Sequence, residues 1–305
     1  MLSGGRAILP RLSRAAAAGL AVALALTAAP PPSIVQIPVT ITDSLGRSFN
    51  GLDAGDIAVY EDNVRQKIVS FGRSDTPLSI GIVLDTSASM GNALERSVLA
   101  ANGLLKTLNS GDEAFLVEVS DRPQLTVAFT HRQGDIQARL ASAQPVGRTA
   151  LLDAIYLALS TMEKAANPRK ALIVISDGLD HGSVYTAAEV GNQVRRADVL
   201  IFGIGVRDSS GPRARSPEDL AGPEALRSLS EPTGGRLFTA EASGDMADVA
   251  AKIGIELRNE YVVGYTSENQ ARDGKYRKIQ VKLVHPRGAP ALHAYWRTGY
   301  FAPTQ

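Results

Sequence analysis

The chain has 305 residues, 44% of them hydrophobic, and its 32 basic and 31 acidic residues leave a net charge of +1. This balance, with an aromatic content of only 5%, gives no strong positive field and argues against a nucleic-acid-binding protein. The chain contains no cysteine, which excludes disulfides, cysteine-bound zinc and a lipid-modified cysteine.

Residues 1–29 have the pattern of a secretory signal peptide. Arg6, Arg11 and Arg14 precede or border an apolar run, and no acidic residue occurs before Asp43. The run is too short for a comfortable membrane span of about 20 residues. We therefore expect an exported protein, periplasmic or extracellular, with no membrane span after cleavage. An uncleaved anchor or a spurious start of the sequence is the alternative.

Residues 34–75 are predicted to form β-structure. Residues 34–42 alternate between apolar and polar side chains, a polar turn follows at 43–47, and further strands are expected at 57–60 and 66–71. Several short strands separated by polar turns indicate half of a small β-sandwich.

Strands and helices alternate from residue 77 to about residue 240. The apolar runs at 79–84, 171–175 and 199–206 are typical of strands buried on both faces. Further strands are expected at 113–119, 127–129 and 236–238, with helices at 92–108, 149–163, 186–196 and 222–230. This order predicts an α/β fold with a doubly wound, mostly parallel sheet. The segment 209–217 is predicted to be a loop by its composition.

A helix at 241–258 is expected to link this domain to a C-terminal β-segment at 259–302. Strands are predicted at 261–265, 277–284, 292–298 and 299–301. Neither flank supplies enough strands for a stable sandwich alone. We therefore expect the two flanks to form one small sandwich into which the α/β domain is inserted.

The predicted strand 79–84 runs directly into a cluster of oxygen-bearing side chains, Asp85, Ser87 and Ser89. Hard oxygen ligands favour Mg²⁺ or a similar cation. In open α/β sheets, ligands bind at the carboxyl ends of the strands, so the triplet predicts a cation site at this edge of the sheet.

Two later segments repeat this design. Thr149 opens a predicted helix, and Ser176 and Asp177 are the first polar residues after the predicted strand 171–175. Each piece also has an ordinary structural interpretation. Thr149 would serve as the N-cap of its helix, and Asp177-Gly178 is a common turn dipeptide.

With these residues in order, the chain resembles the von Willebrand factor A family. The metal-ion-dependent adhesion site of that family is an Asp-x-Ser-x-Ser triplet with a distant Thr and a distant Asp, and every position is occupied here, by Asp85, Ser87, Ser89, Thr149 and Asp177. The arrangement of a von Willebrand factor A domain at 77–240 between β-flanks is similar to that of exported proteins of this kind in acidobacteria.

The resemblance implies how the site would work. The hydroxyls of Ser87, Ser89 and Thr149 would bind Mg²⁺, or Mn²⁺ or Ca²⁺, and the aspartates would act mostly through waters. A free coordination position would then accept an Asp or Glu carboxylate of a partner protein. Arg148, where many members have Gly, would either contact that carboxylate or lie in solvent as a loop residue, and Gly178 would lie near the ligand.

Three classes of function are compatible with such a site. We favour an adhesion or protein-binding module, because the predicted ligands converge without an evident nucleophile or general base. A metal-dependent hydrolase would use the ion to activate water. A structural envelope protein would use it only for stability.

Overall fold

The computed structural model describes Met1 and residues 34–206, 217–240, 245–284 and 291–304. The predicted signal peptide, apart from Met1, and nearly all of the predicted loop 209–217 lie outside these residues. The central sheet has the strand order β10-β9-β8-β5-β6-β7. Its strands are β5 (Leu78–Asp85), β6 (Glu113–Val119), β7 (Gln124–Thr130), β8 (Arg169–Ser176), β9 (Leu200–Val206) and β10 (Leu237–Ala240).

The central strands pair in parallel, except that β7 is antiparallel to β6. Every residue of β5 and of β9 is buried, which explains why their sequences are nearly continuous apolar runs. Along β5, Ile82 and Leu84 join one hydrophobic cluster and Val83 joins another. The sheet is therefore covered on both faces.

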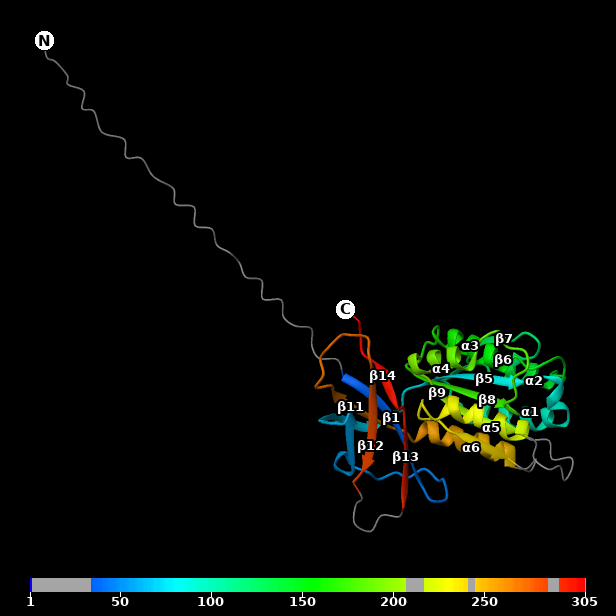
Figure 1. The fold of residues 1–305 in the computed structure, drawn as a ribbon, viewed down its shortest axis with the longest axis horizontal. Coiled ribbons are helices and arrows are strands. Elements are labelled where there is room, and N and C mark those ends of the chain that lie inside the picture. Colours follow the sequence, from blue (N-terminus) through cyan, green and yellow to red (C-terminus); the bar gives the residue numbers. More distant parts are fainter. Residues whose placement is uncertain (2–33, 207–216, 241–244, 285–290, 305) are drawn as a thin grey trace. The chain divides into compact units, whose positions relative to one another are not determined.

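Helices form the two covering layers, as Figure 1 shows for α1 and α6 on one face and α3 and α4 on the other. After the 3₁₀ segment η2 (Ala88–Ala93), the helices are α1 (Leu94–Leu105), α2 (Gln133–Ala141), α3 (Leu151–Met162), α4 (Ala187–Arg196), α5 (Pro217–Ser230) and α6 (Asp245–Arg258). Buried α6 residues Met246, Ile253 and Leu257 share a cluster with Leu104 of α1. The helix expected to link two domains thus packs within the helical layer on the sheet.

Two antiparallel sheets flank this unit. One has the order β13-β1-β11-β4 and the other the order β14-β12-β2-β3. Their strands are β1 (Ile34–Asp43), β2 (Ile57–Glu61), β3 (Val64–Gln66), β4 (Ile68–Arg73), β11 (Tyr261–Thr266), β12 (Tyr276–Leu283), β13 (Leu292–Trp296) and β14 (Gly299–Phe301), with the 3₁₀ turn η1 at Ala54–Asp56. Each sheet combines strands from both flanks, and Ile37, Val59, Val263 and Val281 belong to one hydrophobic cluster. The predicted fold class is confirmed: a mixed α/β chain with a mostly parallel central sheet and flanking antiparallel sheets.

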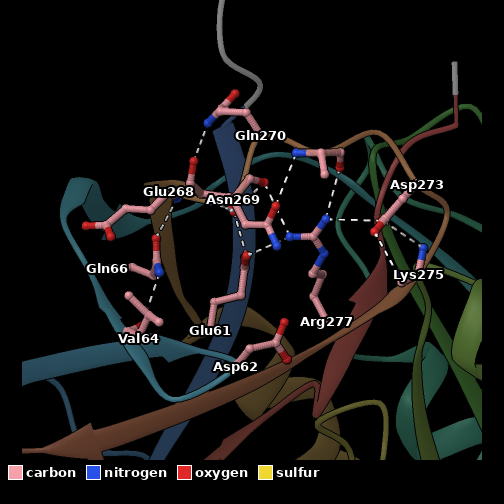
Figure 2. Close-up of polar contacts among 12 residues, drawn as sticks. Glu61, Asp62, Val64, Gln66, Glu268, Asn269, Gln270, Asp273, Lys275 and Arg277 are labelled. Atoms are coloured by element: carbon pink, nitrogen blue, oxygen red, sulfur yellow. Dashed lines mark hydrogen bonds and ion pairs between the residues drawn. The ribbon is translucent and has the colours of Figure 1, made fainter.

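A buried polar network joins the two flanks. The carboxylate of Glu61 accepts hydrogen bonds from Tyr265, Ser267 and Tyr300 at 2.7, 2.5 and 2.9 Å. Arg277 lies 3.6 Å away, and both side chains of this ion pair are 2% exposed. Figure 2 shows Arg277 also reaching the loop that carries Asn269 and Asp273. Because the groups that donate to Glu61 come from segments distant in sequence, the network holds the loop that carries Asn269 and Asp273 against β2.

None of the helices in the described part of the chain combines the length and the apolar content needed to cross a membrane.

Candidate metal centre

Asp85 is the last residue of β5 and is fully buried. One carboxylate oxygen accepts a hydrogen bond of 2.9 Å from the Ser87 amide, and the other accepts one of 2.6 Å from the Ser176 hydroxyl. Burial raises the pKa of Asp85 to about 6, although these hydrogen bonds oppose the rise. The charge of Asp177, the residue that follows the β8 strand end, raises it further.

The hydroxyls of Ser87 and Ser89 lie 3.0 Å apart. Ser87 is fully buried, whereas Ser89 reaches solvent at the start of η2. Ser87 itself has an extended backbone, and the chain turns immediately after it, where the Met90 amide donates to the Ser87 carbonyl at 3.0 Å. The triplet therefore directs two hydroxyls to one place beside the Asp85 carboxylate.

Ser176 and Asp177 bring the end of β8 to the same place. β8 pairs in parallel with β5, so their carboxyl ends meet at one edge of the sheet. Ser176 is fully buried and its hydroxyl, besides donating to Asp85, accepts from the Gly178 amide at 2.9 Å. Asp177 is half-buried and accepts from the Leu179 amide at 2.9 Å. Ser176 was not among the predicted site residues, although it was the first polar residue after the strand.

Gly178 is explained by its backbone. Its φ is +82°, and a Cβ atom there would lie 2.1 Å from the Gly222 carbonyl oxygen of α5. Only glycine tolerates both the left-handed conformation and this close approach. The residue thus allows the chain to turn immediately after Asp177.

The segment before Thr149 is bonded to the Asp85 loop. The Val146 amide donates to the Thr86 carbonyl at 2.8 Å, and the Ala88 amide donates to the Gly147 carbonyl at 2.9 Å. The Arg148 amide donates to Asp121 at 2.7 Å, and the Arg148 guanidinium donates to the His181 carbonyl. The exposed Arg148 is therefore tied to the loop after β8, a contact that neither sequence interpretation of this residue anticipated.

Thr149 is buried, and its carbonyl accepts a hydrogen bond of 2.9 Å from the His181 amide. The interpretation of Thr149 as an N-cap is wrong, because the N-cap of α3 is Ala150, which has no side chain able to accept a hydrogen bond. This leaves the Thr149 hydroxyl without a capping role in its own helix.

The oxygen-bearing side chains at this edge of the sheet suit a hard cation. In the described residues, no cluster of three or more histidine, aspartate or glutamate side chains could hold a metal ion, so serine and threonine hydroxyls would have to complete any ligand set. Mg²⁺ accepts such oxygens and keeps several waters. The residues present therefore fit a Mg²⁺ site in which one or two carboxylates supply the charge.

A cavity of about 100 Å³ lies elsewhere, beside Leu78 and Arg169 at the amino ends of β5 and β8. Arg169 forms a buried ion pair of 2.9 Å there with Glu260, whose pKa burial raises against the opposing charge of Arg169. The predicted ligands lie at the other ends of these strands, so this cavity is separate from the candidate metal centre.

A comparison with protein-family models identifies one domain of the chain. Residues 80–179, which include Asp85, Thr149 and Asp177, match the model of the von Willebrand factor type A domain. The chain contains a von Willebrand factor type A domain. No curated protein matches the chain.

Several solved structures have a similar fold. BatB from Bacteroides thetaiotaomicron is 18% identical over 59% of this chain and 98% of that chain, with a TM-score of 0.44. The vWF domain of the type V pili tip protein Mfa5 from Porphyromonas gingivalis is 12% identical over 60% and 97%, with a TM-score of 0.46. The PilB minor pilin from Streptococcus sanguinis is 12% identical over 62% of each chain, with a TM-score of 0.47. Likenesses of this size carry no argument about activity or partner.

Proposed function

We propose that the protein is an exported adhesion or protein-binding module whose von Willebrand factor type A domain binds a partner through a divalent cation. Asp85, Ser87, Ser89, Thr149 and Asp177 would hold Mg²⁺, with Mn²⁺ or Ca²⁺ as alternatives. When bound, the ion would supply a positive charge with a free coordination position for an Asp or Glu carboxylate of the partner.

The observation that carries this proposal is the hydrogen bond from Ser176 to Asp85. It joins the end of β8, where Asp177 follows, to the end of β5, where Ser87 and Ser89 follow. The Asp177 carboxylate, which is distant in sequence, thereby comes to the same edge of the sheet as the Asp85 carboxylate and the two serine hydroxyls. Ligands bind at such an edge in open α/β sheets.

The chain's own residues prepare the site for a cation. The Ser87 amide and the Ser176 hydroxyl hold the Asp85 carboxylate in one orientation, so little rearrangement is needed when an ion enters. Because Ser87 and Ser89 are neutral, they leave the charge of a bound cation only partly compensated. A negatively charged side chain of a partner would then be attracted to the site.

Isothermal titration calorimetry with Mg²⁺, Mn²⁺ and Ca²⁺ tests the first step. We expect one cation to bind the wild-type protein and Asp85→Ala to lose most of the affinity. Asp248→Ala, which removes an exposed aspartate of α6, is the matched control and should bind as wild type does. Absence of binding by all three cations would contradict the proposal.

Partner binding is tested by capture from an envelope extract with and without chelator. A partner retained by wild-type protein should be lost in chelator and with Asp85→Ala, while Asp248→Ala retains it. The proposal is one of binding, without a catalytic step. Turnover of phosphoester or peptide substrates with Mg²⁺ or Mn²⁺ that disappears in Asp177→Ala would overturn it in favour of a hydrolase.

A further inference from the structure

Helix α3, which follows Thr149, begins without a cap of its own. The first backbone N–H groups of a helix have no partner within the helix and need an acceptor from elsewhere. Ser, Thr, Asp or Asn at the N-cap normally supplies it, but Ala150 occupies that position here. The acceptors must therefore come from another part of the chain.

Asp180, in the loop after β8, provides the missing cap. Its Oδ1 atom accepts hydrogen bonds from the Leu151 amide at 2.8 Å and from the Leu152 amide at 3.5 Å. The Ser183 hydroxyl donates to the same oxygen at 2.6 Å and itself accepts from the Asp153 amide at 3.1 Å. One carboxylate and one hydroxyl thus satisfy the first turn of a helix about 30 residues away, and the negative charge suits the helix N-terminus.

Helix α3 also holds the loop in return. The carboxylate of Asp153 accepts from the amides of Val184 and Tyr185 at 2.9 Å each. The ring of Tyr185 stacks on that of Tyr156 with centroids 3.9 Å apart. The loop and the helix N-terminus therefore form one hydrogen-bonded and packed unit.

This unit lies between two of the predicted ligands. Asp180 is three residues after Asp177, and the amide it caps most closely is two residues after Thr149. The bond from the His181 amide to the Thr149 carbonyl adds a direct link. A shift of either segment would consequently move the other.

We propose that Asp180 is a positioning residue that fixes Thr149 relative to Asp177 by capping α3. This inference rests on the proposed cation site and assigns Asp180 a role outside the ligand set. Losing a group that orients a ligand typically lowers metal affinity about 10- to 100-fold. We therefore expect Asp180→Ala to weaken Mg²⁺ binding about tenfold, whereas Asp180→Asn, which keeps the Oδ1 acceptor but loses the charge, should stay within about threefold of wild type.

The matched control is Thr186→Ala, which removes the side-chain cap of α4 at the other end of the same loop. It should leave Mg²⁺ affinity unchanged, because α4 carries none of the predicted ligands. The control separates the loss of any helix cap from the loss of the cap on α3.

Two measurements on the whole protein test the proposal. Hydrogen–deuterium exchange of metal-free protein, followed in peptides that cover residues 147–156, should accelerate in Asp180→Ala and stay near wild type in Asp180→Asn and Thr186→Ala. In calorimetry, Mg²⁺ affinity should likewise fall in Asp180→Ala and stay near that of wild type in Asp180→Asn and Thr186→Ala. Agreement between exchange and affinity would establish positioning.

Three results would overturn the proposal. Unchanged Mg²⁺ affinity in Asp180→Ala would show that the cap does not matter to the site. Equal losses in Asp180→Asn and Asp180→Ala would indicate that the charge acts on the ion, as in a ligand. Unchanged exchange in Asp180→Ala would show that no cap is lost. If wild-type protein binds no cation, the proposed function fails as well, and the exchange data still report whether the cap exists.

Discussion

The hydroxyl of Ser176 donates a hydrogen bond of 2.6 Å to the carboxylate of Asp85, and both side chains are fully buried. The two residues end neighbouring parallel strands, β8 and β5. The bond stabilises a carboxylate whose burial otherwise favours its neutral form. It therefore keeps Asp85 oriented and ready to act as an anion.

Ser176→Ala should weaken Mg²⁺ binding by about tenfold, a loss typical when a group that orients a metal ligand is removed. The reason is that Asp85 would lose the hydrogen bond to one carboxylate oxygen and be held only by Ser87. Calorimetry with Mg²⁺ measures the effect. Ser230→Ala, which removes another buried serine hydroxyl bonded only to a backbone carbonyl of α5, should bind Mg²⁺ as wild type does. Equal affinities for the two variants would contradict the assigned role of Ser176.

Asp112 is expected to contribute to acid stability. Burial favours its neutral form, but hydrogen bonds from the Arg258 guanidinium and from the amides of Leu78 and Asn109 outweigh it, so the pKa of Asp112 lies below its ordinary value of 3.8. A carboxylate with a lowered pKa in the folded state stabilises the fold above its unfolded-state pKa. This contribution is lost as the pH falls through the lower, folded-state pKa.

The test is urea unfolding of Asp112→Asn between pH 7 and the acid transition. The variant should lose about 2 kcal/mol at pH 7, because it weakens charge-assisted hydrogen bonds, and its stability should fall less steeply than that of wild type below about pH 4. Asp248→Asn, at an exposed position of α6, should follow the wild-type curve. If the free energies of unfolding of Asp112→Asn and wild type depend on pH in the same way, this role of Asp112 is contradicted.

The strands of the central sheet could be predicted closely because burial on both faces makes their sequences distinctive. The apolar run 79–84 became β5 with one residue added at each end. Helix α2 was missed because Ile136 and Leu140 are its only buried residues, and two apolar positions in a polar segment give a weak helical period. The spacing of four residues between them was the available signal.

The triplet at Asp85 could be predicted because its residues are close together in sequence. Ser176 and Asp180 act through partners 91 and 29 residues away, and no local pattern distinguishes such a serine or aspartate from an ordinary turn residue. Their roles depend on how β8 and α3 are placed in space. The same holds for Arg148, whose partner is a backbone carbonyl that carries no sequence signal.

Arg277→Met should destabilise the protein strongly, by about 3 to 5 kcal/mol, because it leaves Glu61 as a buried carboxylate without its cation. The double variant Glu61→Gln, Arg277→Met should lose less than the sum of the two single losses, since the neutral Gln no longer needs a cation. Free energies of unfolding in urea for all four proteins give this coupling. Additive losses would indicate that Arg277 acts through the loop, by way of the Asn269 and Ala271 carbonyls and the Asp273 carboxylate, and not through Glu61.

Gly178→Ala should both destabilise the fold and disturb the candidate metal centre. A left-handed conformation alone costs a residue with a Cβ atom about 1–2 kcal/mol, and the new methyl group would collide with the Gly222 carbonyl. Because Asp177 is the preceding residue, relief of that collision should displace its carboxylate and lower Mg²⁺ affinity.

Gly134→Ala is the matched control: a Cβ atom at this position of α2 meets nothing within 4 Å, so it should leave stability unchanged or raise it by about 0.5 kcal/mol. Thermal unfolding and calorimetry with Mg²⁺ on both variants measure the two effects. A melting temperature of Gly178→Ala equal to that of wild type would show that the chain can turn after Asp177 without glycine.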